Sequence, residues 1–282
     1  MVDEDAKSDF GRGPVSAANK LFTVNNVDAV ITLITEQAKP VIPLFEQHKV
    51  PLLIAWDSNK FIEQAGPYVF ASGFSTEKAG EAAATYAYKN LGLRNVAVIQ
   101  HQEAWSDIIA PSFAEKFVSL GGKIAYKESV GLETTDYRTS ISKIKAAEPD
   151  GTYFALVPPT NAQFIIQARQ FKLPGELLTG DALFQSVIDE TGDGANGIYF
   201  TNTYTTEGEM LTELYKTKYG TNPNDVTTVS MGYDALMKLA ESQQKNTDLY
   251  EGMLSVFGPT RSSERIEKIY QIKNGVPVEV GQ

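Results

Sequence analysis

Cysteine is absent from this sequence, and only two histidines are present, His48 and His101. Without cysteine the chain has no disulfides, no cysteine-ligated zinc and no thiol nucleophile. The two histidines do not form the i, i+4 pair of a helical zinc site, so we expect no histidine-based metal centre. No apolar run approaches the roughly 18 residues that a membrane span requires. Redox, zinc-dependent and membrane-spanning roles are therefore not expected.

Positive charge is also scarce. The chain has 25 Lys and Arg residues and 35 Asp and Glu residues, which gives a net charge of −10. A negative field repels phosphate, so neither nucleic acid nor an anionic membrane surface is an expected partner. The chain contains no Gly-x-Gly-x-x-Gly motif and no P-loop, so it lacks the phosphate cradle of dinucleotide and nucleotide sites. We expect no cofactor. A small zwitterion or cation remains a reasonable ligand.

Alternating strands and helices organise the rest of the chain, most completely between Arg94 and Lys127. The run Val96–Ile99 is typical of a strand buried on both faces of a parallel sheet. Ser106 and Asp107 are expected to cap the helix that follows. Its apolar positions recur at helical spacing and are Ile109, Phe113, Phe117 and Leu120. The loop between this strand and helix is therefore expected at the carboxyl edge of a sheet, where open α/β sheets bind ligands.

The same pattern predicts two α/β lobes. Further strands are expected at 27–33, 50–55, 68–71, 124–130, 153–157, 177–179 and 198–201, with a hairpin at 268–280. Helices are expected from residue 14 and at 36–48, 76–91, 136–147, 161–171, 207–219 and 226–241. About ten strands are too many for one compact doubly wound sheet, and 282 residues are enough for two cores.

Seven ordered stretches then resemble a known family. They are VDAVI, VPLLIAWDSN, GPYVFAS, NVAVI with AWSD and LGGKI, TTDYRTSISKIKAAEPD, QARQFKLPGELLTGDAL and GIYFTNTY. Together they resemble the type I periplasmic binding proteins, in particular the branched-chain amino-acid binding proteins of ABC transporters. The resemblance implies two doubly wound, Rossmann-like lobes joined by hinge crossovers, with residues 1–74 and 203–258 in one lobe and 75–202 and 259–282 in the other.

In function, the resemblance implies a non-enzymatic solute-binding protein. It would capture an amino acid or related small molecule between the lobes, where closure removes the ligand from water. It would then deliver that ligand to the membrane permease of an ABC transporter, at a periplasmic or extracellular, cell-envelope-attached location. The acidic residues that follow Met1 do not have the pattern of a signal segment, so we expect any targeting segment to have been removed or to lie outside this chain. A ligand-sensing domain of a regulator or receptor is an open alternative, and a Rossmann-type enzyme is a third.

The resemblance also implies ligand-binding residues. In the first lobe, Thr35 and Ser58 supply hydroxyl donors for a ligand carboxylate, although helix capping is an equally common role for such residues. Trp56 stands where the family has a small residue, so it either stacks on a flat ligand or fills space. Glu36 would repel a ligand carboxylate, so it is expected either to favour a positive helix N-terminus or to mark a ligand that lacks a carboxylate.

In the second lobe, Trp105 matches the family's aromatic wall and Asp181 its acceptor for the ligand ammonium. A core tryptophan and a cap for a helix at 182–188 are the alternative roles. Pro158 replaces a tyrosine of the branched-chain proteins. No nucleophile or orienting group accompanies His101 and Glu103, so we expect a solvated loop there rather than acid–base chemistry.

The chain departs from the family pattern at its start. Family members begin with an additional strand and a long helix before the segment that matches Val2–Asp9, and their segment matching Leu254–Ile269 is longer. We therefore expect an incomplete first lobe and a chain that resembles a fragment. The strand at 27–33 should then have one open edge with unpaired backbone groups.

Overall fold

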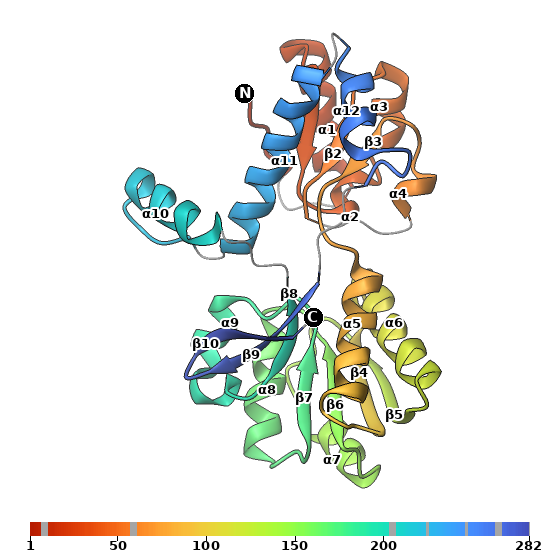
Figure 1. Cartoon of the computed structure of the whole chain (residues 1–282), viewed down its shortest axis with the longest axis vertical. Coiled ribbons are helices and arrows are strands. Elements are labelled where there is room, and N and C mark those ends of the chain that lie inside the picture. Colours follow the sequence, from red (N-terminus) through yellow and green to blue (C-terminus); the bar gives the residue numbers. More distant parts are fainter. Residues whose placement is uncertain are drawn as a thin grey trace. The chain divides into compact units, whose positions relative to one another are not determined.

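The computed structural model describes residues 1–6, 11–56, 61–202, 207–223, 226–245, 248–262 and 267–281. The chain forms two compact units, each a sheet flanked by helices (Figure 1). Unit 1 comprises Met1–Ser75 and Thr205–Arg265, and unit 2 comprises Thr76–Tyr204 and Ile266–Gln282. The expected α/β class with parallel sheets is confirmed. Within the described ranges, no helix is both long and apolar enough to span a membrane.

Unit 2 contains a seven-stranded sheet in the order β10-β9-β8-β7-β6-β4-β5. Its strands are β4 (Asn95–His101), β5 (Lys123–Val130), β6 (Gly151–Ala155), β7 (Glu176–Thr179), β8 (Tyr199–Asn202), β9 (Lys268–Lys273) and β10 (Val276–Gly281). The strands from β5 to β8 are parallel, and β9 runs antiparallel to β8. β9 and β10 form the expected hairpin, because Asn274 and Gly275 both adopt the positive φ that a tight two-residue turn requires.

Helices cover both faces of this sheet. They are α5 (Thr76–Lys89), α6 (Ser106–Ser119), α7 (Arg138–Ala146), α8 (Thr160–Gln170) and α9 (Gln185–Thr191), with a short 3-10 helix at Gly192–Ala195. Figure 1 shows α5 and α6 together on one side and α8 and α9 on the other. Tyr137, Ile141 and Ile144 of the α7 segment are buried, as their spacing predicted. The continuous apolar run of β4 is buried because both of its faces are covered.

Unit 1 contains a three-stranded parallel sheet in the order β1-β2-β3. The strands are β1 (Val30–Thr32), β2 (Leu52–Ile54) and β3 (Val69–Ala71). The helices are α1 (Arg12–Lys20), which continues as a π-helix at Leu21–Asn25, then α2 (Thr35–Ala38), α3 (Ile42–His48), α4 (Phe61–Gln64), α10 (Glu207–Tyr219), α11 (Val226–Lys245) and α12 (Leu249–Phe257). Every residue of β2 and β3 is buried, whereas those of β1 are only half-buried. Among the described residues no strand pairs with the outer side of β1, so the expected open edge is confirmed.

Two local expectations are wrong. The single helix expected at 36–48 is divided into α2 and α3, because Pro40 has no N–H to continue the helical ladder and Pro43 stands in the first turn of α3. Ser106 and Asp107 do not cap α6. Instead the Glu103 carboxylate accepts hydrogen bonds from the backbone N–H groups of Trp105 at 2.9 Å and Ser106 at 2.5 Å.

The close approach of α5 and α6 depends on Gly80. A Cβ atom at this position would lie 2.5 Å from the backbone oxygen of Ile109 and 3.0 Å from the backbone nitrogen of Phe113. Phe113 in turn stacks on Tyr153 of β6, with ring centroids 4.0 Å apart and an interplanar angle of 9°. Separating the two helices would therefore disturb packing against the sheet.

We predict that Gly80→Ala lowers the free energy of unfolding of unit 2 by about 1–2 kcal/mol. The overpacking penalty, about 1–3 kcal/mol, exceeds the gain in helix propensity of about 1 kcal/mol. Unit 2 can be followed alone through Trp105 fluorescence in urea, in a Trp56→Phe background, because the chain has only two tryptophans. Gly232→Ala is the control, because a Cβ atom at Gly232 in α11 meets nothing within 4 Å. It should stabilise unit 1 by about 0.5–1 kcal/mol, followed through Trp56 fluorescence in a Trp105→Phe background. Equal stability of the Gly80 variant and the wild type would contradict this account of the helix pair.

Candidate functional site

The loops after β4, β6 and β7 meet at the carboxyl edge of the unit 2 sheet. β6 lies between β4 and β7 in the sheet, and all three run in the same direction. Trp105 follows β4 and Asp181 follows β7. Ligands of open α/β sheets bind at this edge.

Trp105 and Asp181, which lie far apart in the sequence, form a direct pair. The indole Nε1–H of Trp105 donates a hydrogen bond to Asp181 Oδ1 over 3.0 Å. Gly180 permits this contact, because a Cβ atom there would lie 2.9 Å from Cζ2 of Trp105 and would also collide with Ile109. Asp181 is only 4% exposed, and Trp105 is half-buried. The pair presents a carboxylate held by an aromatic N–H in a largely dry setting.

The alternative role for Asp181 as a helix cap is wrong. The next helix, α9, begins at Gln185 rather than Ala182, and Phe184 stands at its N-cap without a side-chain capping bond. The intervening loop is held instead by Asn161 of α8, whose Nδ2 donates to the Ala182 oxygen over 3.0 Å. The described residues contain no cluster of three or more histidine or acidic side chains that could hold a metal ion.

The loop from Gln100 to Asp107 is tied to the sheet by its polar side chains. Ser106 Oγ donates to the Ala155 oxygen at the end of β6 over 2.9 Å. Gln100 Nε2 donates to Asp107 Oδ1 over 2.8 Å. These bonds explain why neither Ser106 nor Asp107 caps the helix, since both side chains already have partners on the strand side. They also fix the position from which Trp105 reaches Asp181.

His101 is buried at the end of β4, so the expectation that it lies in a solvated loop is wrong. Its Nδ1 accepts a hydrogen bond from the Val157 N–H at 3.0 Å. The proton of the neutral ring must therefore sit on Nε2, which lies 3.2 Å from both Tyr137 Oη and Thr160 Oγ1. Burial lowers the pKa of His101 to about 4, so the ring is neutral near pH 7. His101 thus fixes the loop after β6 and is not positioned to touch a ligand itself.

Two further polar atoms are buried near the carboxyl edge of the unit 2 sheet, and the sequence did not lead us to expect either of them at the site. Within the described part of the chain, Gln100 Oε1 and Tyr153 Oη have no hydrogen-bond partner. Burial and the nearby charge of Asp181 raise the pKa of Tyr153 well above its usual value, so its hydroxyl keeps its proton. A glutamine that ends the apolar run of β4 was a visible signal for Gln100. Tyr153 gave no such signal, because a tyrosine inside a buried strand is typical of a core.

In unit 1, Thr35 and Trp56 follow the carboxyl ends of the neighbouring strands β1 and β2. Thr35 is the first residue of α2 and is buried. Trp56 is 9% exposed and packs edge-to-face on Phe74, with ring centroids 6.0 Å apart. Ser58 lies outside the described residues. The ligand contacts expected of these three residues remain predictions.

Two other observations concern the same edge of unit 1. Glu36 forms an ion pair with Lys39 at 3.2 Å, so its charge is partly balanced within its own turn. Ser72, which directly follows β3, is buried, and its Oγ has no partner among the described residues. A serine placed immediately after a buried strand was the sequence signal that could have found it. Ser72 joins Thr35 as a second hydroxyl at this edge.

Comparison of the chain with known proteins identifies the family to which it belongs. Residues 2–246 match the family model described as periplasmic binding protein. The chain belongs to this family. No curated protein sequence matches the chain. Two branched-chain amino-acid binding proteins share the fold of this periplasmic binding protein. The leucine-binding protein LivK of Thermotoga maritima has a TM-score of 0.84 at 24% identity, over 98% of this chain and 85% of LivK.

The second is LivJ of Streptococcus pneumoniae, solved with isoleucine, which has a TM-score of 0.87 at 18% identity over 100% of this chain and 87% of LivJ. A solute-binding protein of an ABC transporter from R. palustris, solved with benzoate, has a TM-score of 0.80 at 18% identity over 99% of this chain and 83% of that protein. The resemblance to type I periplasmic binding proteins is thereby confirmed. Identities this low show a common fold and leave the ligand open.

The buried His101 predicts a pH dependence of stability. The ordinary pKa of histidine, 6.5, applies to the unfolded chain, and the folded value is about 4. The unfolded chain therefore binds the proton first, and the free energy of unfolding falls as the pH is lowered from 6.5 towards 4. At about 1.4 kcal/mol per pKa unit, this contribution reaches about 3 kcal/mol at most.

His101→Gln should have a shallower dependence of unfolding free energy on pH between 6.5 and 4 than the wild type, measured by urea denaturation at each pH. The matched control is His48→Gln, which changes the only other histidine, an exposed residue of unit 1. This control should retain the wild-type slope. A slope unaffected by His101→Gln would show that carboxylates alone account for any acid sensitivity.

Proposed function

We propose that this protein captures an amino acid or a closely related small solute and delivers it to the membrane permease of an ABC transporter. The observation that carries the proposal is the Asp181 carboxylate, held nearly buried at the carboxyl end of β7 by the indole N–H of Trp105. A carboxylate in such surroundings favours a cationic partner, because little water is available to solvate its charge. The ammonium group of an amino acid is such a partner.

The relatives support a small solute and differ in its chemistry. LivK is a leucine-binding protein, LivJ was solved with isoleucine, and the R. palustris protein was solved with benzoate. Benzoate carries an anion and no cation, so it offers nothing that Asp181 could bind. The ammonium group of an amino acid would pair with this carboxylate, and the half-buried ring of Trp105 supplies an apolar surface beside it. We therefore favour an amino acid over an aromatic acid.

Residues of unit 1 complete the proposed contacts. Thr35 and Ser58 would donate hydroxyl hydrogen bonds to the ligand carboxylate, and Trp56 would contribute apolar surface. In this division of roles the two lobes recognise opposite ends of one zwitterion. That division suits a protein of net charge −10, because the ligand as a whole is neutral. A periplasmic or extracellular location, next to the permease, follows from the family.

A ligand panel tests this proposal by isothermal titration calorimetry. It comprises leucine, isoleucine, valine and phenylalanine, with benzoate and 4-hydroxybenzoate as aromatic acids. The sharpest comparison is leucine against 4-methylpentanoate, which retains the side chain and carboxylate but lacks the amine. We expect binding of at least one amino acid and a loss of affinity of tenfold or more, about 1.4 kcal/mol, when its amine is removed. Tighter binding of an aromatic acid than of every amino acid would overturn the amino-acid assignment.

Asp181→Asn should weaken binding of the preferred amino acid by at least about tenfold, because a charge-assisted hydrogen bond contributes about 1.5–3 kcal/mol. The unliganded melting temperature should change little, since the amide preserves the shape of the carboxylate and Asp181 does not cap a helix. The matched control is Asp189→Asn, an exposed residue of α9 whose Oδ1 accepts from Gln185 at 2.8 Å. This control removes the same charge from unit 2 and should leave affinity unchanged. Equal losses in both variants would assign the effect to net charge rather than to a contact.

A further inference from the structure

The sequence contains two Asn-Gly dipeptides, and the fold of unit 2 brings them together. Asn196-Gly197 lies before β8, and Asn274-Gly275 forms the turn between β9 and β10. The Gly275 N–H donates a hydrogen bond to Oδ1 of Asn196 over 3.0 Å. The Gly197 N–H donates to the carbonyl oxygen of Ile272 in β9 over 2.9 Å. Each dipeptide is therefore held through its glycine N–H by the other segment.

The backbone explains why these dipeptides stand where they do. Asn274 and Gly275 have φ values of 52° and 75°, and Gly197 has a φ of 84°. Most side chains strain the backbone in this left-handed region, whereas glycine and asparagine adopt it readily. A two-residue hairpin turn with positive φ at both positions favours Asn-Gly for the same reason.

An Asn-Gly dipeptide is also the most reactive setting for an asparagine side chain. The backbone nitrogen of the glycine attacks Cγ of the asparagine, and the new N–C bond closes a five-membered succinimide ring. The Cγ–Nδ2 bond breaks, and ammonia leaves with the proton from the glycine N–H. Water then opens the ring at either carbonyl and gives aspartate or isoaspartate. Glycine has no Cβ atom to obstruct the attack, and the attack is slow while the glycine N–H donates a hydrogen bond.

The two asparagines are restrained to different degrees. Asn196 is held through its side-chain oxygen by Gly275, and its backbone oxygen accepts a hydrogen bond from Nη2 of Arg169 over 2.8 Å. The Asn274 side chain is exposed, and within the described ranges it has no hydrogen-bond partner. The Asn274 carboxamide can therefore turn towards Gly275, and the bond from Gly275 to Asn196 is what opposes the attack.

We propose that Asn274 is a deamidation site of this protein and that Asn196 sets the rate of the reaction by engaging the Gly275 N–H. Asn196 itself reacts later, because its own side-chain oxygen and the N–H of Gly197 are both held in hydrogen bonds. The reaction needs no partner other than water.

The modification changes the hairpin in which it occurs. Either product carries a new carboxylate, and isoaspartate also adds one methylene group to the backbone of the turn. That group no longer fits the register in which Val276 pairs with Lys273. Ile269 and Ile272 anchor β9 in the core at 1% exposure, whereas Val276 of β10 is 58% exposed. We therefore expect β10 to loosen while β9 stays in the sheet.

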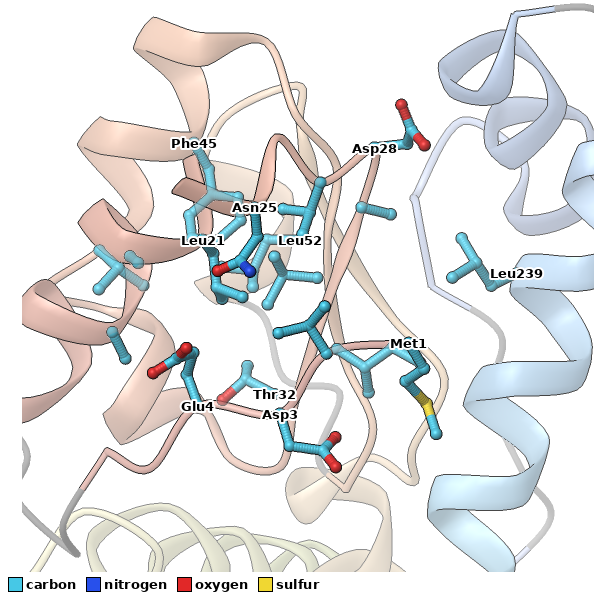
Figure 2. A pocket seen from close by; sticks show the side chains of 18 of the residues that line it. Met1, Asp3, Glu4, Leu21, Asn25, Asp28, Thr32, Phe45, Leu52 and Leu239 are labelled. Carbon is cyan, nitrogen blue, oxygen red and sulfur yellow. The ribbon is translucent and has the colours of Figure 1, made fainter. Parts of the chain in front are cut away.

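The test follows the full chain at mildly alkaline pH, in buffer and in urea, by mass spectrometry of proteolytic peptides. In urea the two Asn-Gly dipeptides should react at similar rates. In buffer Asn274 should react more slowly than in urea, and Asn196 more slowly than Asn274. Asn25 is the internal reference, because it precedes Asn26 rather than glycine and lines a cavity of about 680 Å³ in unit 1 (Figure 2). It should stay unmodified in buffer, and its reaction at the rate of Asn274 would contradict the assignment to Asn-Gly chemistry.

A matched pair of variants tests the role of Asn196. Asn196→Ala removes the acceptor, whereas Asn196→Asp keeps an acceptor oxygen in the same place. We expect Asn196→Ala to speed the reaction at Asn274 about fivefold, the factor that corresponds to about 1 kcal/mol. Asn196→Asp should keep the wild-type rate. Hydrogen exchange of the Ile272 amide, which donates to the Ile198 oxygen over 3.0 Å, shows whether the hairpin stays folded in each variant.

Asn274→Gly tests the consequence for β10. It keeps a turn sequence that accepts positive φ at both positions but has no carboxamide to lose. After prolonged incubation, the amides of β10 should exchange faster in the wild type than in this variant, while those of β4 exchange equally in both.

Three results would overturn the proposal. The first is equal reaction of Asn274 in buffer and in urea, because no protection would then exist. The second is the same rate in Asn196→Ala and Asn196→Asp, which would exclude the acceptor as the cause even where the alanine variant disturbs the hairpin. The third is modification of Asn196 before Asn274 in the folded chain. None of these measurements uses a solute, so their outcome is independent of the proposed function.

Discussion

A parallel strand is stable only where helices cover both of its faces and neighbouring strands take up its backbone groups. In unit 2 this constraint is met around β4, β6 and β7, which lie side by side between two helical layers. Because these three strands are parallel neighbours, the loops that follow them lie together at the carboxyl edge of the sheet. Residues as distant in sequence as Trp105 and Asp181 are brought into hydrogen-bond contact in this way. The candidate solute site is thus a consequence of how the sheet is covered.

The electrostatics of that site follow from the same burial. A nearly buried carboxylate must be compensated, and the indole N–H of Trp105 contributes to this by donating a hydrogen bond to Asp181. A neutral donor stabilises the charge without cancelling it, which is the physical basis of the proposed preference for a positively charged ligand group. Burial raises the pKa of the neighbouring Tyr153 hydroxyl, and the charge of Asp181 raises it further, so this hydroxyl keeps its proton.

Periodicity predicted most of the secondary structure, because apolar runs and helical spacing are local properties of the chain. The segments of β4, α6, α7 and the C-terminal hairpin were found in this way. Apart from the helix divided at Pro40, errors arose where tertiary contacts decide the outcome. Ser106 and Asp107 have the composition of caps, yet Ala155 and Gln100 engage their side chains across the sheet. His101 was expected in solvent because its partners, Val157, Tyr137 and Thr160, are distant in sequence. The free Tyr153 hydroxyl left no trace in the sequence pattern at all.

The open edge of β1 has a consequence for the unit 1 residues proposed to contact a solute. The carbonyl oxygen of Thr32 accepts a hydrogen bond from the Ala55 N–H at 2.9 Å. The carbonyl oxygen of Leu33 accepts one from the Trp56 N–H at 2.8 Å. Thr35 begins the helix that follows the same strand. The placement of both Trp56 and Thr35 therefore depends on β1, a half-buried three-residue strand that pairs with another strand on one side only within the described ranges. A strand with one free edge opens locally more readily than one paired on both sides, because fewer hydrogen bonds must break. Opening of β1 would therefore loosen the positions of Thr35 and Trp56 together, because the same strand sets both.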